Sequence, residues 1–147
     1  MPAALWALSL LFLLRVLGQV LVVFAGATWL PAPEEWYSGL LPYPLLLPVQ
    51  LAILGLMLAV NLRASRGRSH PAVRRPRLGR ALIASAAVYA TVMVVRYAVS
   101  GALNPERRLL PPGILPIVFH WVLAAYLAVL GAFVLREPRS NRRLAER

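Results

Sequence analysis

Four long runs of apolar residues dominate the chain and decide what it can fold into. They cover residues 3–30, 43–62, 81–100 and 114–135. A helix crosses the hydrocarbon core of a bilayer in about 20 residues, and each run reaches that length. A water-soluble fold of 147 residues could not bury a chain that is 60% hydrophobic and only 14% charged. The sequence therefore predicts one membrane domain, spanning residues 1–147.

The spanning segments are predicted to be helices. The runs lack the two-residue alternation of a membrane β-strand, and lipid offers an open backbone no hydrogen-bond partners. Most of the 13 prolines fall between the runs or close to the start of one, where a missing N–H is tolerated. The predicted fold class is all-α, a polytopic bundle of four transmembrane helices.

The distribution of arginine predicts the orientation. All 16 basic residues are Arg: seven lie in the 63–80 loop and five in the 136–147 tail, while the opposite side has only Arg107 and Arg108. Cytoplasmic loops carry the excess of basic residues, so both termini are expected to be cytoplasmic. The absence of Lys and Asp is typical of a GC-rich bacterial genome. The predicted location is therefore a bacterial inner membrane, which the chain crosses several times.

The net charge of +11 is explained by this topology. We therefore expect the bilayer, with anionic lipids at the cytoplasmic face, as the partner of the basic segments, and no nucleic acid. One alternative stays open: Ala25-Gly26-Ala27 has the form of a signal-peptidase site. Cleavage after Ala27 would leave three spans and an outward N-terminus, but no basic segment precedes the apolar run.

Arg15 is the one charged residue in the first run. If Leu30 marks the outer boundary, Arg15 lies about 22 Å below it and about 8 Å from the cytoplasmic edge. A side chain of this length can reach the interface from there, so Arg15 is predicted to be an intramembrane anchor. The alternative is a buried partner, with Gln19 one turn away.

Three polar residues on the other runs reach one common depth. Counted from the inner ends of their helices, Gln50, Arg96 and His120 lie about 6–10 Å beneath the outer surface. The outward connection carries Glu34 and Glu35. One interpretation is that these residues are interface anchors and packing residues. The other is a ligand-binding pocket in which Arg96, His120 and Gln50 converge with Glu34 or Glu35.

Groups that support catalysis or metal binding are scarce. The sequence has no Cys and no Asp, and no acid lies inside an apolar run. Its two histidines, His70 and His120, fall on opposite sides of the predicted membrane. We therefore expect no catalytic residues, no metal site and no cofactor, although a single haem ligand from His120 or a bound quinone stays open. Proton relays use intramembrane carboxylates, which are missing here.

The stretch LLRVLGQVLVVFAG (residues 13–26) is similar to the first helix of DoxX-like four-helix membrane proteins. Arg15, Gly18 and Gly26 are the matching residues. The resemblance implies a four-helix membrane fold, and no site residue follows from it because that family is varied in role.

Two functions remain as hypotheses. The first is a non-catalytic accessory or structural subunit of a membrane assembly, with other membrane subunits as partners. The second is a membrane enzyme or binding protein whose outer-leaflet pocket holds a lipid headgroup, a quinone or another amphipathic anion.

Overall fold

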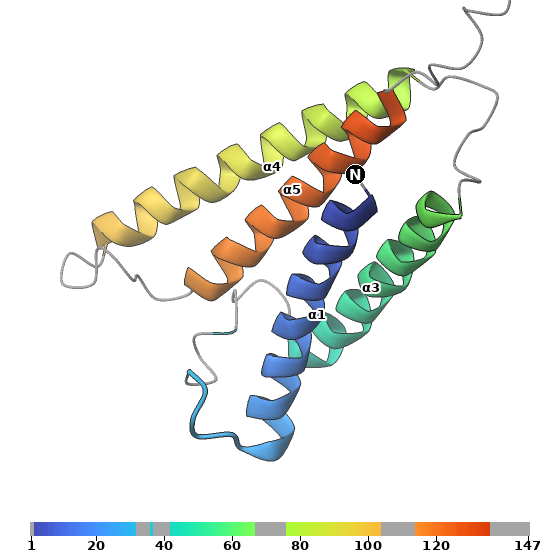
Figure 1. Cartoon of the computed structure of the whole chain (residues 1–147). Coiled ribbons are helices and arrows are strands. Elements are labelled where there is room, and N and C mark those ends of the chain that lie inside the picture. The colour runs from blue at the N-terminus through green and yellow to red at the C-terminus, as the bar shows by residue number, and fades with distance from the viewer. Residues whose placement is uncertain (1, 32–35, 37–41, 67–75, 104–113, 136–147) are drawn as a thin grey trace, which may run out of the picture.

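The computed structural model describes residues 2–31, 36, 42–66, 76–103 and 114–135. These form four helices: α1 (Pro2–Ala25), α3 (Tyr43–Ser65), α4 (Pro76–Leu103) and α5 (Ile114–Leu135). Each helix is long and apolar enough to cross a membrane (Figure 1). The predicted all-α fold is confirmed, and the four helices that are long and apolar enough to span a bilayer suggest a multi-pass membrane protein.

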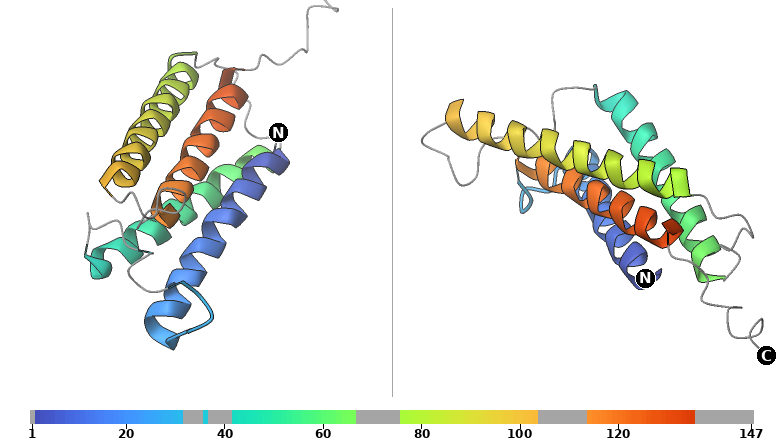
Figure 2. Two further views of the ribbon diagram at one scale, coloured as in Figure 1. Left: turned by 90° about the vertical axis from the view of Figure 1, so that its left-hand side faces the viewer. Right: turned by 90° about the horizontal axis from the view of Figure 1, so that it is seen from above.

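The four helices follow one another side by side. In the described part of the chain, α4 packs against α5, α5 against α1, and α1 against α3 (Figure 2). They alternate in direction, so α1 and α4 begin where α3 and α5 end (Figure 1). We call this the basic end, because four exposed arginines lie there: Arg63, Arg66, Arg77 and Arg80. The opposite end is called the loop end.

Helix α1 ends earlier than the apolar run does. Gly26 adopts a left-handed φ of 60°, and the amide of Ala27 turns back to donate to the carbonyl of Leu21 at 3.3 Å. Such a glycine cap stops a helix because the backbone can no longer continue its hydrogen-bond ladder. Helix α1 therefore ends at Ala25 and not at Leu30. Helix α4, in contrast, extends beyond its apolar run at both ends.

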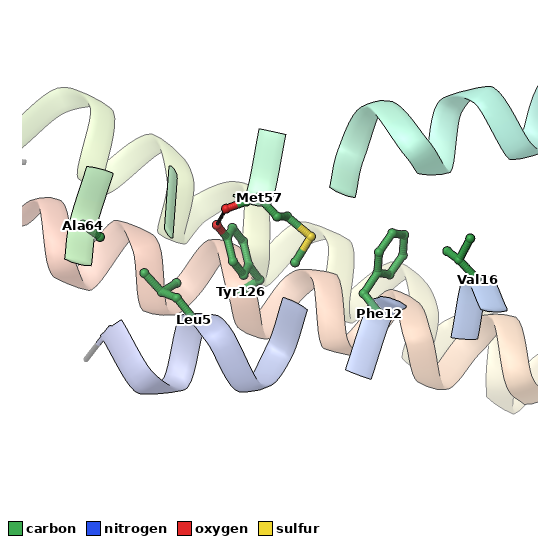
Figure 3. Packing of buried hydrophobic residues seen from close by; sticks show 6 residues of the cluster. All are labelled: Leu5, Phe12, Val16, Met57, Ala64 and Tyr126. Carbon is green, nitrogen blue, oxygen red and sulfur yellow. Dashed lines mark hydrogen bonds between the residues drawn. The ribbon is translucent and has the colours of Figure 1, made fainter. Parts of the chain in front are cut away.

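Helices α1 and α3 meet along a seam in which buried residues recur at intervals of three and four. On α1 the seam is Leu5, Ser9, Phe12, Val16 and Gln19; on α3 it is Gln50, Leu54, Met57, Asn61 and Ala64. This spacing keeps one stripe of each helix facing its neighbour, as in a coiled coil. Figure 3 shows the apolar part of the seam, which Tyr126 of α5 joins from the third helix.

Helices α4 and α5 approach each other through glycine. A Cβ at Gly131 would lie 2.9 Å from the carbonyl oxygen of Gly79, and a Cβ at Gly79 would lie 3.0 Å from that of Gly131. The two backbones are thus in direct contact near the basic end. Small residues permit such close approach, which is a main source of helix association in lipid.

Candidate functional site

The α1–α3 seam contains two buried polar layers separated by apolar side chains. The first, the Asn61 layer, lies nearer the basic end. Asn61 Nδ2 donates to Ser9 Oγ at 2.8 Å, and Tyr126 Oη donates to Asn61 Oδ1 at 3.0 Å. Ser9 Oγ in turn donates to the Leu5 carbonyl at 2.8 Å. This network joins α1, α3 and α5, and each of its side chains has a hydrogen-bond partner.

The second layer, the glutamine layer, lies nearer the loop end. Gln50 Nε2 donates to Gln19 Oε1 at 3.0 Å, and the two side chains are 3% and 1% exposed. Gln19 Nε2 and Gln50 Oε1 are buried without a hydrogen-bond partner. Exchanging O and N in both amides would change the direction of the bond but would still leave one donor and one acceptor unpaired. This layer is therefore only half satisfied, at a cost of about 1–3 kcal/mol for each unpaired group.

Arg15 lies one helical turn from Gln19 and points into the bundle. Its side chain is only 6% exposed, and its guanidinium carbon lies 5.7 Å from the centre of the Phe119 ring on α5. Arg15 Nε is buried without a hydrogen-bond partner. With α1 ending at Ala25, Arg15 lies about 15 Å from the loop end of its helix and about 20 Å from the basic end. Arg15 is therefore buried against a neighbouring helix, whereas its role as an anchor at the cytoplasmic interface stays a prediction.

His120 of α5 connects Arg15 to α4. Its Nδ1 contacts the carbonyl oxygen of Pro116, which can only accept, so Nδ1 carries the proton. Its ring packs on Tyr89 of α4 with 5.4 Å between ring centres and an angle of 47°. Both Arg15 and Arg96 lie within electrostatic reach of this imidazole. Arg15 of α1 and Arg96 of α4 thus both lie near His120 of α5.

The structure divides the three residues that were predicted to share a depth. Counted along its own helix, each of Gln50, Arg96 and His120 lies about 9–11 Å from the loop end. Their common depth in a membrane stays a prediction. Gln50, however, bonds to Gln19 in the α1–α3 seam, whereas His120 and Arg96 belong to the α4–α5 side. Arg15 lies on α1, the helix that packs against both α3 and α5. We call Arg15, Arg96 and His120 the cluster. Glu34 and Glu35 lie outside the described residues.

Trp36 covers the neighbouring part of α1. Its indole is 6% exposed, and a Cβ at Gly18 would lie 2.6 Å from the ring. The indole Nε1 donates to the Pro31 carbonyl at 3.0 Å. Gly18 is three residues from Arg15, so an aromatic ring packs close to the cluster on the loop side. The glycine is needed there because any side chain would displace the indole.

The chemical character of the cluster is cationic and hydrogen-bonding. None of the described residues is Asp or Glu, and among them no three metal-ligating side chains lie together. Arg15 contributes one unpaired donor, Nε, and the glutamine layer one helical turn away contributes an unpaired donor, Gln19 Nε2, and an unpaired acceptor, Gln50 Oε1. Donors of this kind can bind an oxygen-rich group.

The Asn61 layer was not predicted from the sequence. The signal was present, because Gln50, Met57, Asn61 and Ala64 follow the same three-and-four spacing along α3. Polar residues in that register face a partner helix. Tyr126 gave no comparable signal, since a tyrosine within a span is common without any buried partner.

A scan against protein-family models, a search of curated proteins and a search of solved structures each returned no match. The similarity of the first helix to DoxX-like proteins therefore stays a prediction.

Proposed function

We propose that the chain is a non-catalytic inner-membrane protein that serves as an accessory or structural subunit of a membrane assembly. The observation that supports this role is the outer face of α4. Within the described residues α4 packs only against α5, and it carries an exposed apolar ridge of Val88, Val92, Val95, Val99 and Leu103. The spacing of three and four residues suits the groove of another transmembrane helix.

Photocrosslinking in membranes tests this role. A photoreactive amino acid replaces Val92 on the α4 ridge, and in a control it replaces Leu14, an equally exposed residue on α1. We expect Val92 to capture one defined membrane polypeptide that also co-purifies with the chain in a constant ratio. Labelling of lipid alone from both positions would contradict the accessory role.

The proposed orientation places both termini and the 63–80 loop in the cytoplasm. It is supported by the exposed arginines at the basic end, since basic residues are retained on that side. Cysteines introduced at Ser69 and Asn104 should differ toward an impermeant thiol reagent added to intact cells. Asn104→Cys is expected to react and Ser69→Cys to be protected; the reverse pattern would invert the topology.

A second candidate function is the binding of an amphipathic molecule, such as a lipid headgroup, a quinone or another anion, toward the outer leaflet. The specific observation that favours it is the buried guanidinium of Arg15, which is 6% exposed and lies over the ring of Phe119, the residue next to His120 on α5. Ionisable residues inside a membrane usually face the bundle interior and have a functional partner.

A further inference from the structure

Three buried polar atoms toward the loop end have no hydrogen-bond partner. Arg15 Nε and Gln19 Nε2 are donors on successive turns of α1, and Gln50 Oε1 is an acceptor on α3 whose side chain is held beside Gln19 by the Gln50–Gln19 hydrogen bond. We propose that these three side chains bind the acid group, a carboxylate or a phosphate, of an amphipathic molecule. The inference extends the second candidate function and does not depend on the accessory role.

The charge of Arg15 determines the class of ligand. A buried guanidinium is strongly unfavourable without a counter-charge, and the described part of the chain contains no acidic residue. Its ring contact with Phe119 offsets only part of that cost. A carboxylate or phosphate supplies the missing charge and accepts hydrogen bonds from both Arg15 and Gln19. A neutral carbonyl would satisfy the donors but would leave the charge uncompensated.

The acceptor adds a second requirement. Gln50 Oε1 needs a hydrogen-bond donor, and an acid group that retains one proton provides an O–H beside its accepting oxygens. A phosphate monoester that keeps one proton has this O–H and still carries a negative charge, whereas a carboxylate supplies the charge but no donor. The three unpaired protein atoms thus match a singly protonated phosphate monoester most completely, and a carboxylate would leave Gln50 Oε1 unsatisfied.

The position of the cluster requires that the acid carry an apolar body. Arg15 lies about 15 Å from the loop end of its helix, near the middle of a segment long enough to cross the hydrocarbon core. The Phe119 ring lies against Arg15, and the Trp36 ring packs on Gly18, three residues along the same helix. A small soluble anion would have to leave water completely to reach the cluster, but an amphiphile gains by burying its chain.

The test uses the purified full-length protein in neutral-lipid nanodiscs. The probes are oleic acid, dioleoyl phosphatidic acid, oleyl alcohol as a neutral analogue, and soluble acetate and phosphate. Native mass spectrometry measures binding, and thermal unfolding measures stabilisation. We expect at least one of the two acidic amphiphiles to bind and to raise the unfolding temperature, and oleyl alcohol to do neither. Which of the two binds distinguishes a carboxylate from a phosphate lipid.

Three variants locate the binding. Arg15→Gln should weaken binding of the acidic probe at least tenfold. It should leave the ligand-free protein as stable as before, because an uncompensated buried charge is removed. Gln19→Leu should weaken binding several-fold through the lost donor. Arg80→Gln, a control at the basic end, should bind like the unchanged protein.

Each other outcome contradicts the proposal. Equal losses of binding in Arg15→Gln and Arg80→Gln would mean that acidic lipid is attracted generally to the basic surface. Binding of acetate or phosphate as tight as that of the amphiphiles would mean a soluble anion site. Acidic amphiphile that binds independently of Arg15 would preserve the second candidate function and overturn this site, whereas failure of every probe would overturn both.

Discussion

The two neighbouring pairs of helices are held together by different means. In the α4–α5 pair, Gly79 and Gly131 bring two backbones into contact, and the partners are main-chain atoms. In the α1–α3 pair, large apolar side chains fill the seam, and polar side chains link the helices in the Asn61 layer and the glutamine layer. Helix α5 belongs to both arrangements, because its Tyr126 reaches the Asn61 layer.

The difference follows from the solvent. Lipid tails are as apolar as leucine, so burial alone does not drive helices together in a membrane. Close packing of small residues and interhelical hydrogen bonds are the remaining forces, and this chain uses one in each pair. Packing depends on shape and tolerates no added atom at the crossing. Hydrogen bonds fix the register of the seam. A polar side chain in the seam can also keep an unpaired donor or acceptor, and such an atom can bind a ligand.

The largest effect is expected where backbone meets backbone. A Cβ at Gly131 would lie 2.8 Å from Ile83 as well as 2.9 Å from the Gly79 carbonyl, and backbone cannot move aside. Gly131→Ala should therefore destabilise the protein by about 1–3 kcal/mol, measured by reversible unfolding in detergent. Gly55→Ala is the matched control, because no atom lies within 4 Å of its added Cβ. Equal stability of the two variants would show that the α4–α5 crossing is not tight.

The sequence was sufficient for the number and type of elements and insufficient for their packing. Four apolar runs of membrane length leave little choice about helices, because lipid forbids an unpaired backbone. The end of α1 was misplaced because the apolar run continues to Leu30, while the deciding residue, Gly26, acts through its backbone angle.

The sequence identified the polar residues of the candidate site but did not predict which of them lie together. Rise per residue predicts one level for Gln50, Arg96 and His120. Which of them meet depends on the order of the helices in space, and the sequence does not reveal that α1 lies between α3 and α5. For the same reason, the packing of Arg15 against Phe119 of α5 could not be predicted.

A smaller effect is expected at the Asn61 layer. Asn61→Leu keeps the approximate shape of the side chain but removes the bonds to Ser9 and Tyr126. Interhelical hydrogen bonds in membranes contribute about 0.6 kcal/mol on average and at most about 1.7, so the loss should be about 1–2 kcal/mol. A double-mutant cycle with Tyr126→Phe measures the coupling, since that variant removes only the hydroxyl. Strict additivity would mean that the Tyr126 bond contributes nothing to stability.

The smallest net effect is expected at the glutamine layer, and it distinguishes a structural pair from a binding site. Gln19→Leu and Gln50→Leu, made singly, should each destabilise by about 1 kcal/mol, because the remaining amide loses its partner. Made together they should be nearly neutral, since the layer already holds one unpaired donor and one unpaired acceptor and leucine leaves neither. The unfolding free energies of the four proteins close the cycle. The double variant Asn61→Leu with Tyr126→Phe provides the contrast. It should be clearly destabilised, because the Asn61 layer loses hydrogen bonds that are formed in the unchanged protein. If the double glutamine variant keeps its stability and no longer binds the acidic amphiphile, the glutamine layer serves binding. If the double variant is destabilised by the sum of the two single effects, the glutamine layer is a structural element like the Asn61 layer.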